Sequence, residues 1–300
     1  MCKLDEKYFH DDKAARKYLE AILWPNSAVC PHCGTVDSAY ETSKEGVYRC
    51  AEKECRKDFT VTVGTVFERS KIALHKWLLA SFLLCSSKKG MSAHQLHRTI
   101  GVTYKTAWFM AHRLREAMSD GSAGPLGGKD KIVEVDETYW GNVGKQKPGA
   151  RGGSHKMKVV SLVERDGKKR SYHVANVTAK TVKPILQAQI HKRSRLMTDE
   201  AKVYKKLGQE FAGQEVVNHS AGEYARNDVT TNTVESSFAI LKRGLYGVYH
   251  HVSEAHLQRY ATEFDFRWNY REKLGFNDSA RTYAAIKGIA GKRLMYRHTS

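Results

Sequence analysis

Three carboxylates stand at positions in the sequence where they could do chemistry together. Asp136 follows the alternating run IVEV, Asp199 follows the short run RLMT, and Glu235 comes early in the apolar stretch NTVESSFAIL. Each acid therefore ends a predicted strand or opens a predicted helix. If the fold brings them together, their oxygens are the ligands that Mg²⁺ and Mn²⁺ prefer. Glu137 and Glu200 compete for these roles, but neighbours on a strand face opposite sides.

A lysine and several polar residues accompany Glu235. Lys242 follows Glu235 by seven positions, so both residues lie on one face of a helix. Its ammonium could hold a phosphate as a point charge, and Arg243 beside it could do the same. Asn232, one turn earlier, is a supporting group or an alternative ligand. His219 follows a predicted strand and is either a supporting group or simply buried.

Four cysteines near the N-terminus have the spacing of a metal site. The pattern Cys-x2-Cys-x16-Cys-x4-Cys is formed by Cys30, Cys33, Cys50 and Cys55. Each pair can lie on a tight turn, so that four thiolates surround one Zn²⁺ and leave no open position, which favours a structural site. The residues between the pairs alternate as two strands joined by a turn, and KDFTVTVGTVFE alternates as another strand. We therefore predict a zinc ribbon.

The elements after residue 131 would position the three carboxylates. KIVEVDETYWG, KMKVVSLVER and RSYHVANVT alternate as three strands of an antiparallel meander. AKTVKPILQAQIH predicts a helix, SRLMTDE a strand beside the first, KVYKKLGQEF a helix and QEVVNHS another strand. The helix that carries Glu235 is predicted to have Thr230, Thr231 or Asn232 as its N-cap. This order is typical of a ribonuclease H-like domain, in which a mixed sheet is flanked by helices.

Residues 70–120 are predicted to form a helix-turn-helix. KIALHKWLLASFLLCSS is an apolar helix. Ser92 caps a short second helix, and Gly101 makes the turn before a third helix that Thr103 caps. In this arrangement the last helix enters the major groove of DNA. We expect its exposed, DNA-facing side to carry Tyr104, Lys105, Thr106, His112, Arg113 and Arg115. A plain helical bundle is the alternative.

The chain is strongly basic. Lys and Arg number 50 against 32 Asp and Glu, which gives a net charge of +18. A chain this basic most often binds a polyanion, and nucleic acid is the leading candidate. No apolar run reaches the roughly 18–20 residues that span a membrane. The N-terminal residues lack the apolar core of a signal peptide. We therefore expect a cytoplasmic, nucleoid-associated protein with reduced thiols and no membrane partner.

The order of these motifs resembles that of a known family. The two N-terminal motifs are followed by VEVDETYWG, LMTDEAKVY, NTVESSFAILKRG and YHHVSEAHLQRYATEFDFRWNYR along nearly the whole chain. The chain resembles the bacterial insertion-sequence transposases of the IS fifteen-ninety-five group, which have an Asp-Asp-Glu (DDE) triad in an ISXO-like domain. The resemblance implies that Asp136 bridges two Mg²⁺ or Mn²⁺ ions and that Asp199 and Glu235 each hold one. In some members an Asn replaces the third acid, so Asn232 stays an alternative to Glu235.

The resemblance also implies an activity and partners. The enzyme would bind terminal inverted repeats of double-stranded DNA, release a 3′-hydroxyl at each element end and direct it at a target phosphate. Two ends must be joined in concert, so we expect a homodimer or a larger assembly on DNA. The alternatives are a DNA-binding regulator with a zinc ribbon and a helix-turn-helix, and a ribonuclease H-like nuclease or resolvase.

These elements predict an α+β or α/β chain of several domains. Lys145 and Lys147, in a Gly- and Lys-rich loop, are expected to contact the DNA backbone. The stretch SDGSAGPLGGKDK is rich in Gly and Ser and is typical of a linker. The predicted order is an N-terminal helix and zinc ribbon, a helix-turn-helix, a catalytic domain and a basic tail, over residues 1–69, 70–120, 131–275 and 276–300.

Overall fold

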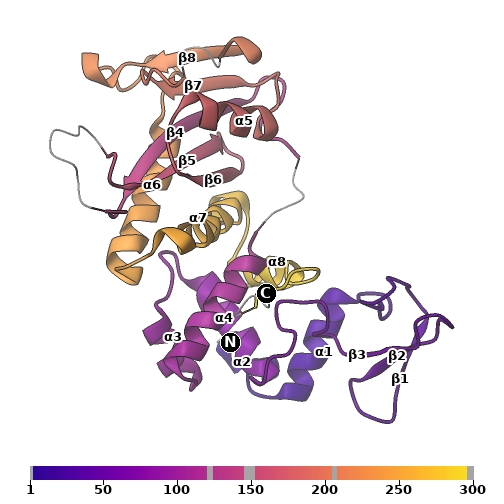
Figure 1. The fold of residues 1–300 in the computed structure, drawn as a ribbon. Coiled ribbons are helices and arrows are strands. Elements are labelled where there is room, and N and C mark those ends of the chain that lie inside the picture. Colours follow the sequence, from indigo (N-terminus) through magenta and orange to yellow (C-terminus); the bar gives the residue numbers. More distant parts are fainter. Residues whose placement is uncertain (1–2, 120–123, 145–152, 205–207, 296–300) are drawn as a thin grey trace. The chain divides into compact units, whose positions relative to one another are not determined.

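The computed structural model describes residues 3–119, 124–144, 153–204 and 208–295 (Figure 1). The chain divides into two compact units. Unit 1 comprises Met1–Ser119 and Phe276–Ser300, and unit 2 comprises Asp120–Gly275. The mixed α+β content that the sequence predicts is confirmed. Within the described ranges, no helix has the length and apolarity needed to cross a membrane.

The zinc-ribbon region of unit 1 follows helix α1 (Asp12–Leu23). Its antiparallel sheet has the order β1-β2-β3, formed by Ala39–Glu41, Tyr48–Cys50 and Asp58–Phe59. The predicted third strand is wrong beyond Phe59, because turns follow it. Threonine hydroxyls bond to nearby backbone there, as Thr65 Oγ1 does to the carbonyl of Thr62 at 2.7 Å. Such local bonds compete with strand pairing.

Three helices follow in unit 1, as the sequence predicts: α2 (Leu74–Ser86), α3 (Ala93–Ile100) and α4 (Tyr104–Ala117). The side chain of Ser92 accepts a hydrogen bond from the N–H of Gln95 and caps α3. Thr103 caps α4 in the same way, through the N–H of Thr106. Gly101 ends α3 with a φ of +64°, which favours glycine. Both predicted caps and the predicted turn are confirmed.

The C-terminal segment differs from the prediction, in which residues 276–300 form a basic tail. Residues Asp278–Lys287 form helix α8, which belongs to unit 1. Asn277 caps it by accepting from the N–H of Ala280, and Ile286 is buried. At Gly288 the chain passes so close to α4 that a Cβ would lie 2.4 Å from the carbonyl oxygen of Ala117. The tail prediction is wrong because a short helix with few apolar residues gives a weak periodic signal.

The sheet of unit 2 has five strands in the order β6-β5-β4-β7-β8. Strands β4, β5 and β6 are antiparallel, whereas β7 runs parallel to β4, and β8 runs parallel to β7. The predicted meander is confirmed, and so is the placement of the Asp199 strand beside the Asp136 strand. Their bounds, in chain order, are Ile132–Trp140, Met157–Glu164, Lys169–Val174, Arg195–Asp199 and Gly213–Val217.

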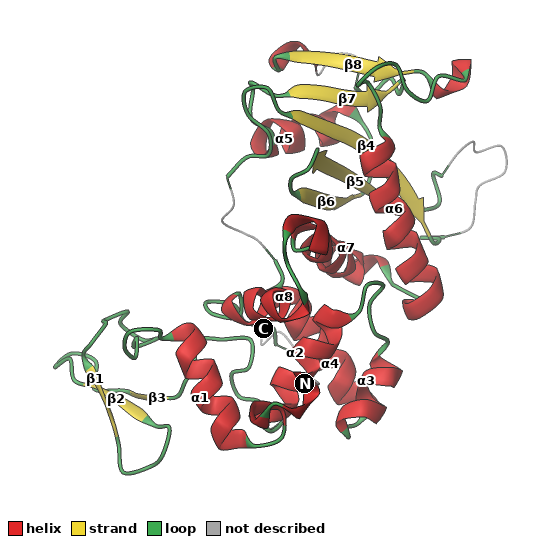
Figure 2. Cartoon of the chain, turned by 180° about the vertical axis from the view of Figure 1, so that it is seen from behind, coloured by secondary structure: helices red, strands yellow, loops and turns green. Residues whose placement is uncertain are grey.

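Helices cover both faces of this sheet (Figure 2). Helix α5 (Ala179–Gln189) packs on the face that contains Val133 and Val135. Helices α6 (Asn232–Gly244) and α7 (Glu254–Asn269) pack on the opposite face. The N-cap of α6 is Thr231, one of the three residues predicted for this position.

The helix predicted over residues 202–211 is wrong for the described residues. Residues 202–204 form a turn, and Gly208–Glu210 form a short 3-10 helix. Tyr204 lies in that turn and is buried in the core beside α5. The remaining short helical turns are Lys3–Asp5, Lys7–Phe9, His219–Ala221, Leu245–Tyr249 and Glu272–Leu274.

Candidate functional site

Asp136 and Asp199 lie on neighbouring strands, at the same level and on the same face of the sheet. Strands β4 and β7 run parallel, and Glu134 pairs with Met197 at the end of their ladder. Each aspartate comes two residues after this pair, and residues two apart on a strand share a face. Trp140, four residues after Asp136, packs against α6 and so identifies the face. The two aspartates therefore project on the side that α6 covers.

Glu235 lies in the first turn of α6 and is 44% exposed. Its Oε1 accepts a hydrogen bond from Thr231 Oγ1 at 2.7 Å. His219 Nε2 lies 3.3 Å from the same oxygen and 3.3 Å from Thr231 Oγ1. The structure thus places His219 in contact with Glu235. Asn232 is exposed at the beginning of the same helix.

The three carboxylates influence one another's charge. Burial, together with the charges of Glu137, Asp199 and Glu235, raises the pKa of Asp136 to about 8. The N–H of Glu137 donates a hydrogen bond of 2.7 Å to Asp136 Oδ1, and this bond lowers the pKa of Asp136 in part. Burial also raises the pKa of Asp199, with contributions from Glu200 and Glu235, while His219 opposes the rise. Burial disfavours a charged carboxylate unless a cation or a donor compensates for it.

Glu137 and Glu200, which directly follow Asp136 and Asp199 in the chain, make hydrogen bonds with other residues. Glu137 faces the α5 side, where it accepts a hydrogen bond from the buried Tyr204 hydroxyl at 2.6 Å. Glu200 accepts hydrogen bonds from Ser220 and from the N–H of His219, and these lower its pKa to about 2. Asp136 accepts from the N–H of Glu137 on one oxygen and projects on the opposite face, which α6 covers. The fold therefore places Glu137 on the other face of the sheet from Asp136, and hydrogen bonds from residues 219 and 220 occupy the carboxylate of Glu200.

The four cysteines of unit 1 converge on one point. Cys30 Sγ lies 3.8 Å from Cys55 Sγ, and Cys33 Sγ lies 3.6 Å from Cys50 Sγ. All four sulfurs lie within 4.8 Å of one another. Thiolates bound tetrahedrally to one Zn²⁺ at about 2.3 Å are about 3.8 Å apart, so this cluster can hold a structural zinc.

The acidic residues are spread more widely than the cysteines. In the described part of the chain, only the four cysteines place three or more ligand atoms within 4.8 Å of one another. The three carboxylates therefore share a face and an electrostatic environment without such close contact. Lys242 is partly buried and Arg243 is exposed, both in the last turn of α6.

The exposed side of α4 is smaller than the sequence predicts. Tyr104 is exposed and stacks on His94, with ring centroids 4.3 Å apart, and Lys105 is also exposed. The expectation that His112 and Arg115 lie outside is wrong, because both are buried. Within unit 1, helix α4 contacts α2, α3 and α8, so only part of its surface reaches solvent.

Arg113 is also held inside unit 1. Its guanidinium donates to the carbonyl oxygens of Glu68 at 3.1 Å and Leu294 at 3.2 Å. It also lies 4.8 Å from the centroid of the Phe109 ring. Burial lowers the pKa of Arg113 from its ordinary value. These contacts hold the partly buried guanidinium of Arg113 within unit 1, whereas the sequence predicts an exposed side chain.

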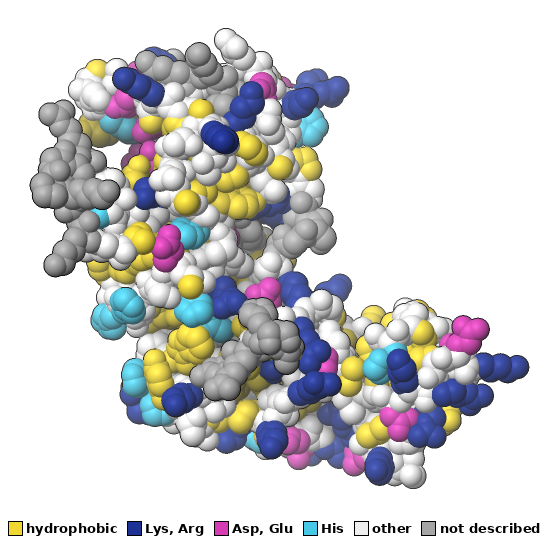
Figure 3. Space-filling model, viewed as in Figure 1, with side chains coloured by type: hydrophobic (Ala, Val, Ile, Leu, Met, Phe, Trp, Pro, Cys, Tyr) yellow, Lys and Arg dark blue, Asp and Glu magenta, His cyan; other side chains and the backbone are white. Residues whose placement is uncertain are grey.

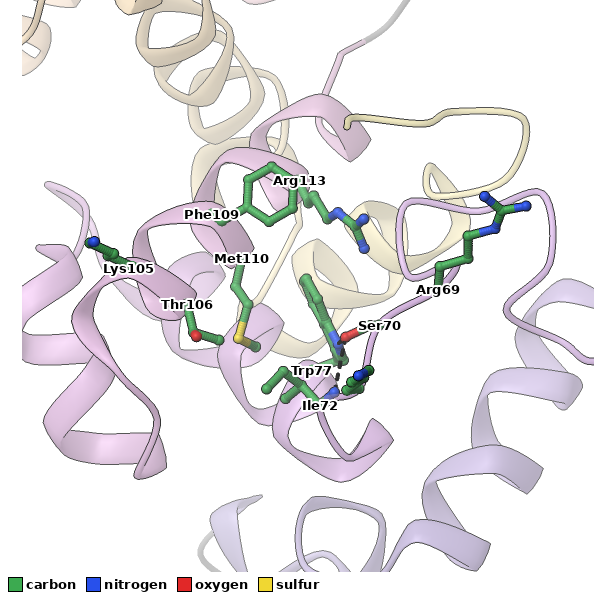
Figure 4. A pocket seen from close by; sticks show the side chains of 10 residues that line it. Arg69, Ser70, Ile72, Trp77, Lys105, Thr106, Phe109, Met110 and Arg113 are labelled. Carbon is green, nitrogen blue, oxygen red and sulfur yellow. Dashed lines mark hydrogen bonds between the residues drawn. The ribbon is translucent and has the colours of Figure 1, made fainter. Parts of the chain in front are cut away.

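A pocket of about 310 Å³ lies beside this helix. In Figure 4, Trp77, Phe109 and Met110 lie between Lys105 on one side and Arg69 on the other. Figure 3 shows Lys and Arg side chains spread over the visible face of unit 1. This surface can attract a polyanion. Lys145 and Lys147, which were also expected to contact DNA, lie outside the described residues.

Glu134 and Arg165 are two further residues of this site that the sequence motifs do not point to. Glu134 is fully buried and makes an ion pair with Arg165, whose Nε lies 2.7 Å from Glu134 Oε1. The signal was present in the sequence, because Glu134 stands between Val133 and Val135 in a strand. A buried acid must have partners to offset its desolvation.

The raised pKa of Asp136 predicts a pH-dependent stability. With no Mg²⁺ or Mn²⁺ added, the unfolded chain releases this proton near the ordinary pKa of 3.8, whereas the folded chain keeps it up to about 8. The free energy of unfolding should therefore fall as the pH rises between these values. Asp136→Asn should remove up to about 1.4 kcal/mol per pH unit of this slope. Urea unfolding of both proteins across this range measures the difference, and parallel curves would contradict it.

Comparisons with known proteins give three results. The family described as ISXO2-like transposase domain matches residues 125–269, and the transposase zinc-ribbon domain matches residues 10–58. The chain is 30% identical over 289 residues to the "Uncharacterized protein in transposable element ISH50" of Halobacterium salinarum, which covers 90% of this chain and 95% of that protein. A solved structure, the Drosophila P element transposase strand transfer complex, aligns with a TM-score of 0.28 and 11% identity. That alignment covers 73% of this chain and 64% of the other, and a likeness this low is no basis for assigning the fold.

Proposed function

Because this chain belongs to the ISXO2-like family of insertion-sequence transposases, we propose that it cuts DNA at the ends of an insertion sequence and joins them to target DNA. One observation carries this proposal. Asp136 and Asp199 lie at one level and on one face of the sheet, and Glu235 begins the helix that covers this face. The three antiparallel strands followed by two parallel ones support a ribonuclease H-like fold for unit 2.

In this proposal, Asp136, Asp199 and Glu235 hold two Mg²⁺ or Mn²⁺ ions. When bound, the ions would activate the attacking hydroxyl and stabilise the leaving oxygen. Asp136 lies on the central strand β4, beside the strand of Asp199, and would be the ligand shared by both ions.

Other residues of unit 2 would support the ligands and the substrate. Thr231 and His219 both contact Glu235 and would orient its carboxylate. Lys242 lies two turns further along α6 and would contact a DNA phosphate, with Arg243 beside it. Asn232 is exposed at the beginning of the same helix and would be a supporting group or, in place of Glu235, the third ligand.

Unit 1 would bind the element ends. We propose that α3 and α4 act as a helix-turn-helix, with Tyr104, Lys105 and Thr106 towards the DNA. The zinc ribbon would have a structural role beside them. Because two ends must be joined in concert, the active form would be a homodimer or a larger assembly on double-stranded DNA.

The direct test is incubation of the full chain with duplex DNA that contains a candidate terminal inverted repeat, in the presence of Mg²⁺. A free 3′-hydroxyl at the element end, mapped by primer extension, is the expected product. DNA that is bound but stays uncut at every candidate end would instead favour a DNA-binding regulator. Cuts without preference for the ends would favour a general nuclease.

Lys105 and Arg113 should behave differently when each is replaced with alanine. Lys105→Ala should reduce the slope of log affinity against log salt concentration by about one, as the loss of one phosphate contact does. Arg113→Ala should lower the melting temperature of unit 1, because the carbonyls of Glu68 and Leu294 lose their donor. Fluorescence anisotropy at several salt concentrations and thermal unfolding of both variants measure these effects. An unchanged salt slope for Lys105→Ala would remove this residue from the DNA surface.

A further inference from the structure

Glu134 is a fully buried carboxylate two residues before Asp136 on strand β4. Residues two apart on a strand project on the same face, so Glu134 shares the face of Asp136. A buried charge is costly unless it is paired and hydrogen-bonded. The partners of Glu134 therefore show what this residue does.

Glu134 caps helix α6 from a different element of the fold. Its Oε2 accepts from the backbone N–H groups of Thr233 at 2.8 Å and Val234 at 2.9 Å. These N–H groups lie in the first turn of α6, where the helix itself offers no acceptor. The N-cap residue Thr231 makes no side-chain capping bond. The carboxylate supplies that cap, and the helix dipole favours a negative charge there.

Arg165 connects the same carboxylate to the loop that leads into α6. Its Nε donates to Glu134 Oε1 at 2.7 Å. Its other two guanidinium nitrogens donate to the carbonyl oxygens of Asp228 at 2.6 Å and Thr230 at 2.8 Å. A planar guanidinium can satisfy these three acceptors at once, which an ammonium cannot do with the same geometry. Strand β4, the loop and the helix are thereby tied together.

All acceptor positions of Glu134 are in use. Oε1 accepts from Arg165 Nε and from Thr233 Oγ1, and Oε2 accepts from two backbone N–H groups. A carboxylate offers about four lone-pair sites, so none is left for a cation. Glu134 is therefore no ligand itself, although it stands close to Asp136 in the sequence.

We propose that Glu134 and Arg165 form a clamp that sets the separation between Asp136 and Glu235. Asp136 lies two residues from Glu134 on β4, and Glu235 directly follows Val234, whose N–H the clamp holds. The clamp thus connects Asp136, on its segment of β4, with Glu235, in the first turn of α6. Glu134 and Arg165 are positioning residues, and this role rests on the proposed metal site of Asp136, Asp199 and Glu235.

The test is a Mn²⁺ titration of the zinc-loaded full chain, followed by the electron paramagnetic resonance signal of free Mn²⁺. Glu134→Gln should weaken Mn²⁺ binding about 10-fold, the lower end of what loss of an outer hydrogen-bond partner costs at metal sites. A glutamine has a single acceptor oxygen, so its NH2 group would face either the N–H groups of α6 or the guanidinium of Arg165, and one side of the clamp would be lost. Arg165→Lys keeps the charge but cannot bond to Glu134, Asp228 and Thr230 with the same geometry. This variant should therefore also bind Mn²⁺ more weakly than the wild type.

Glu263→Gln is the matched control. Glu263 is also fully buried and also pairs with a guanidinium, that of Arg267, but on helix α7. This variant should lose stability in urea and keep the Mn²⁺ affinity of the wild type. If Glu263→Gln weakened Mn²⁺ binding as much as Glu134→Gln, the effect would be general destabilisation and the clamp would be refuted.

The remaining outcomes distinguish a failure of the clamp proposal from a failure of the proposed metal site. Wild-type Mn²⁺ affinity in folded Glu134→Gln would overturn the clamp. If Glu134→Gln does not fold, Arg165→Lys decides, and unchanged affinity there would overturn the clamp as well. Asp136→Asn is titrated alongside. Wild-type Mn²⁺ binding by that variant would refute the proposed metal site, whatever the clamp variants show.

Discussion

Asp136→Asn should lower the rate of DNA strand cleavage about 10³-fold, because losing a metal ligand forfeits several kcal/mol of charge stabilisation in the transition state. The substitution keeps the size of the side chain and removes its charge. Asp136 lies in unit 2, whereas the proposed end-binding helices lie in unit 1. DNA affinity should therefore stay close to that of the wild type. Single-turnover cleavage of labelled end DNA in Mg²⁺, together with anisotropy on the same DNA, measures both quantities.

Glu137→Gln is the matched control for this prediction. Glu137 is the next residue on the same strand, but it faces the α5 side and is bound to Tyr204. Its substitution should change cleavage far less than that of Asp136. Equal losses in the two variants would indicate general damage to β4. Full cleavage by Asp136→Asn would refute the metal role of this residue.

Removing the zinc ligands should unfold the ribbon in unit 1. Structural zinc sites with thiolate ligands contribute on the order of 10 kcal/mol to folding, far more than this small sheet can supply. Cys50→Ser should therefore release the zinc and open the aromatic cluster of Trp24, Tyr48 and Phe59. Limited proteolysis with mass spectrometry should find new cuts between residues 24 and 59, while the sheet of unit 2 stays protected. Binding to end DNA should weaken.

Cys85→Ala is the control for the zinc prediction. Cys85 is also buried, but it lies in α2 and outside the four-cysteine cluster. This variant should keep one zinc per chain and resist protease in the ribbon. If Cys50→Ser also kept one zinc and the same protease resistance, the four-cysteine site would not be the zinc site.

Several features of this protein were predicted correctly because their signals are local. The spacing of the four cysteines predicted their cluster, and the alternation of IVEVDETYW predicted β4. The caps at Ser92 and Thr103 act within three residues of themselves. Features of this kind depend on neighbours in the chain, so a single sequence contains the information.

Predictions of secondary structure and exposure from local patterns were wrong where tertiary packing determines them. Residues 202–211 have a helical composition, yet Tyr204 lies in a turn and is buried in the core. His112 and Arg115 look like surface residues, yet both are buried. Helix α8 lies in the stretch that looked like a tail. Burial by a distant element overrides the preference of a short segment.

The local pattern identified the candidate acids, because Asp136 and Asp199 stand in predicted strands and Glu235 opens a predicted helix. The expectation that Asp136 ends its strand is wrong, since β4 continues to Trp140. The differences between the acids arise from contacts between distant segments. The register of β4 against β7 places Asp136 beside Asp199, Tyr204 holds Glu137, and Arg165 holds Glu134. The bonds from Glu134 to Thr233 and Val234 join residues about a hundred positions apart in the chain. Such a contact exists only after the strands and helices have packed, so no local pattern in the sequence could reveal it.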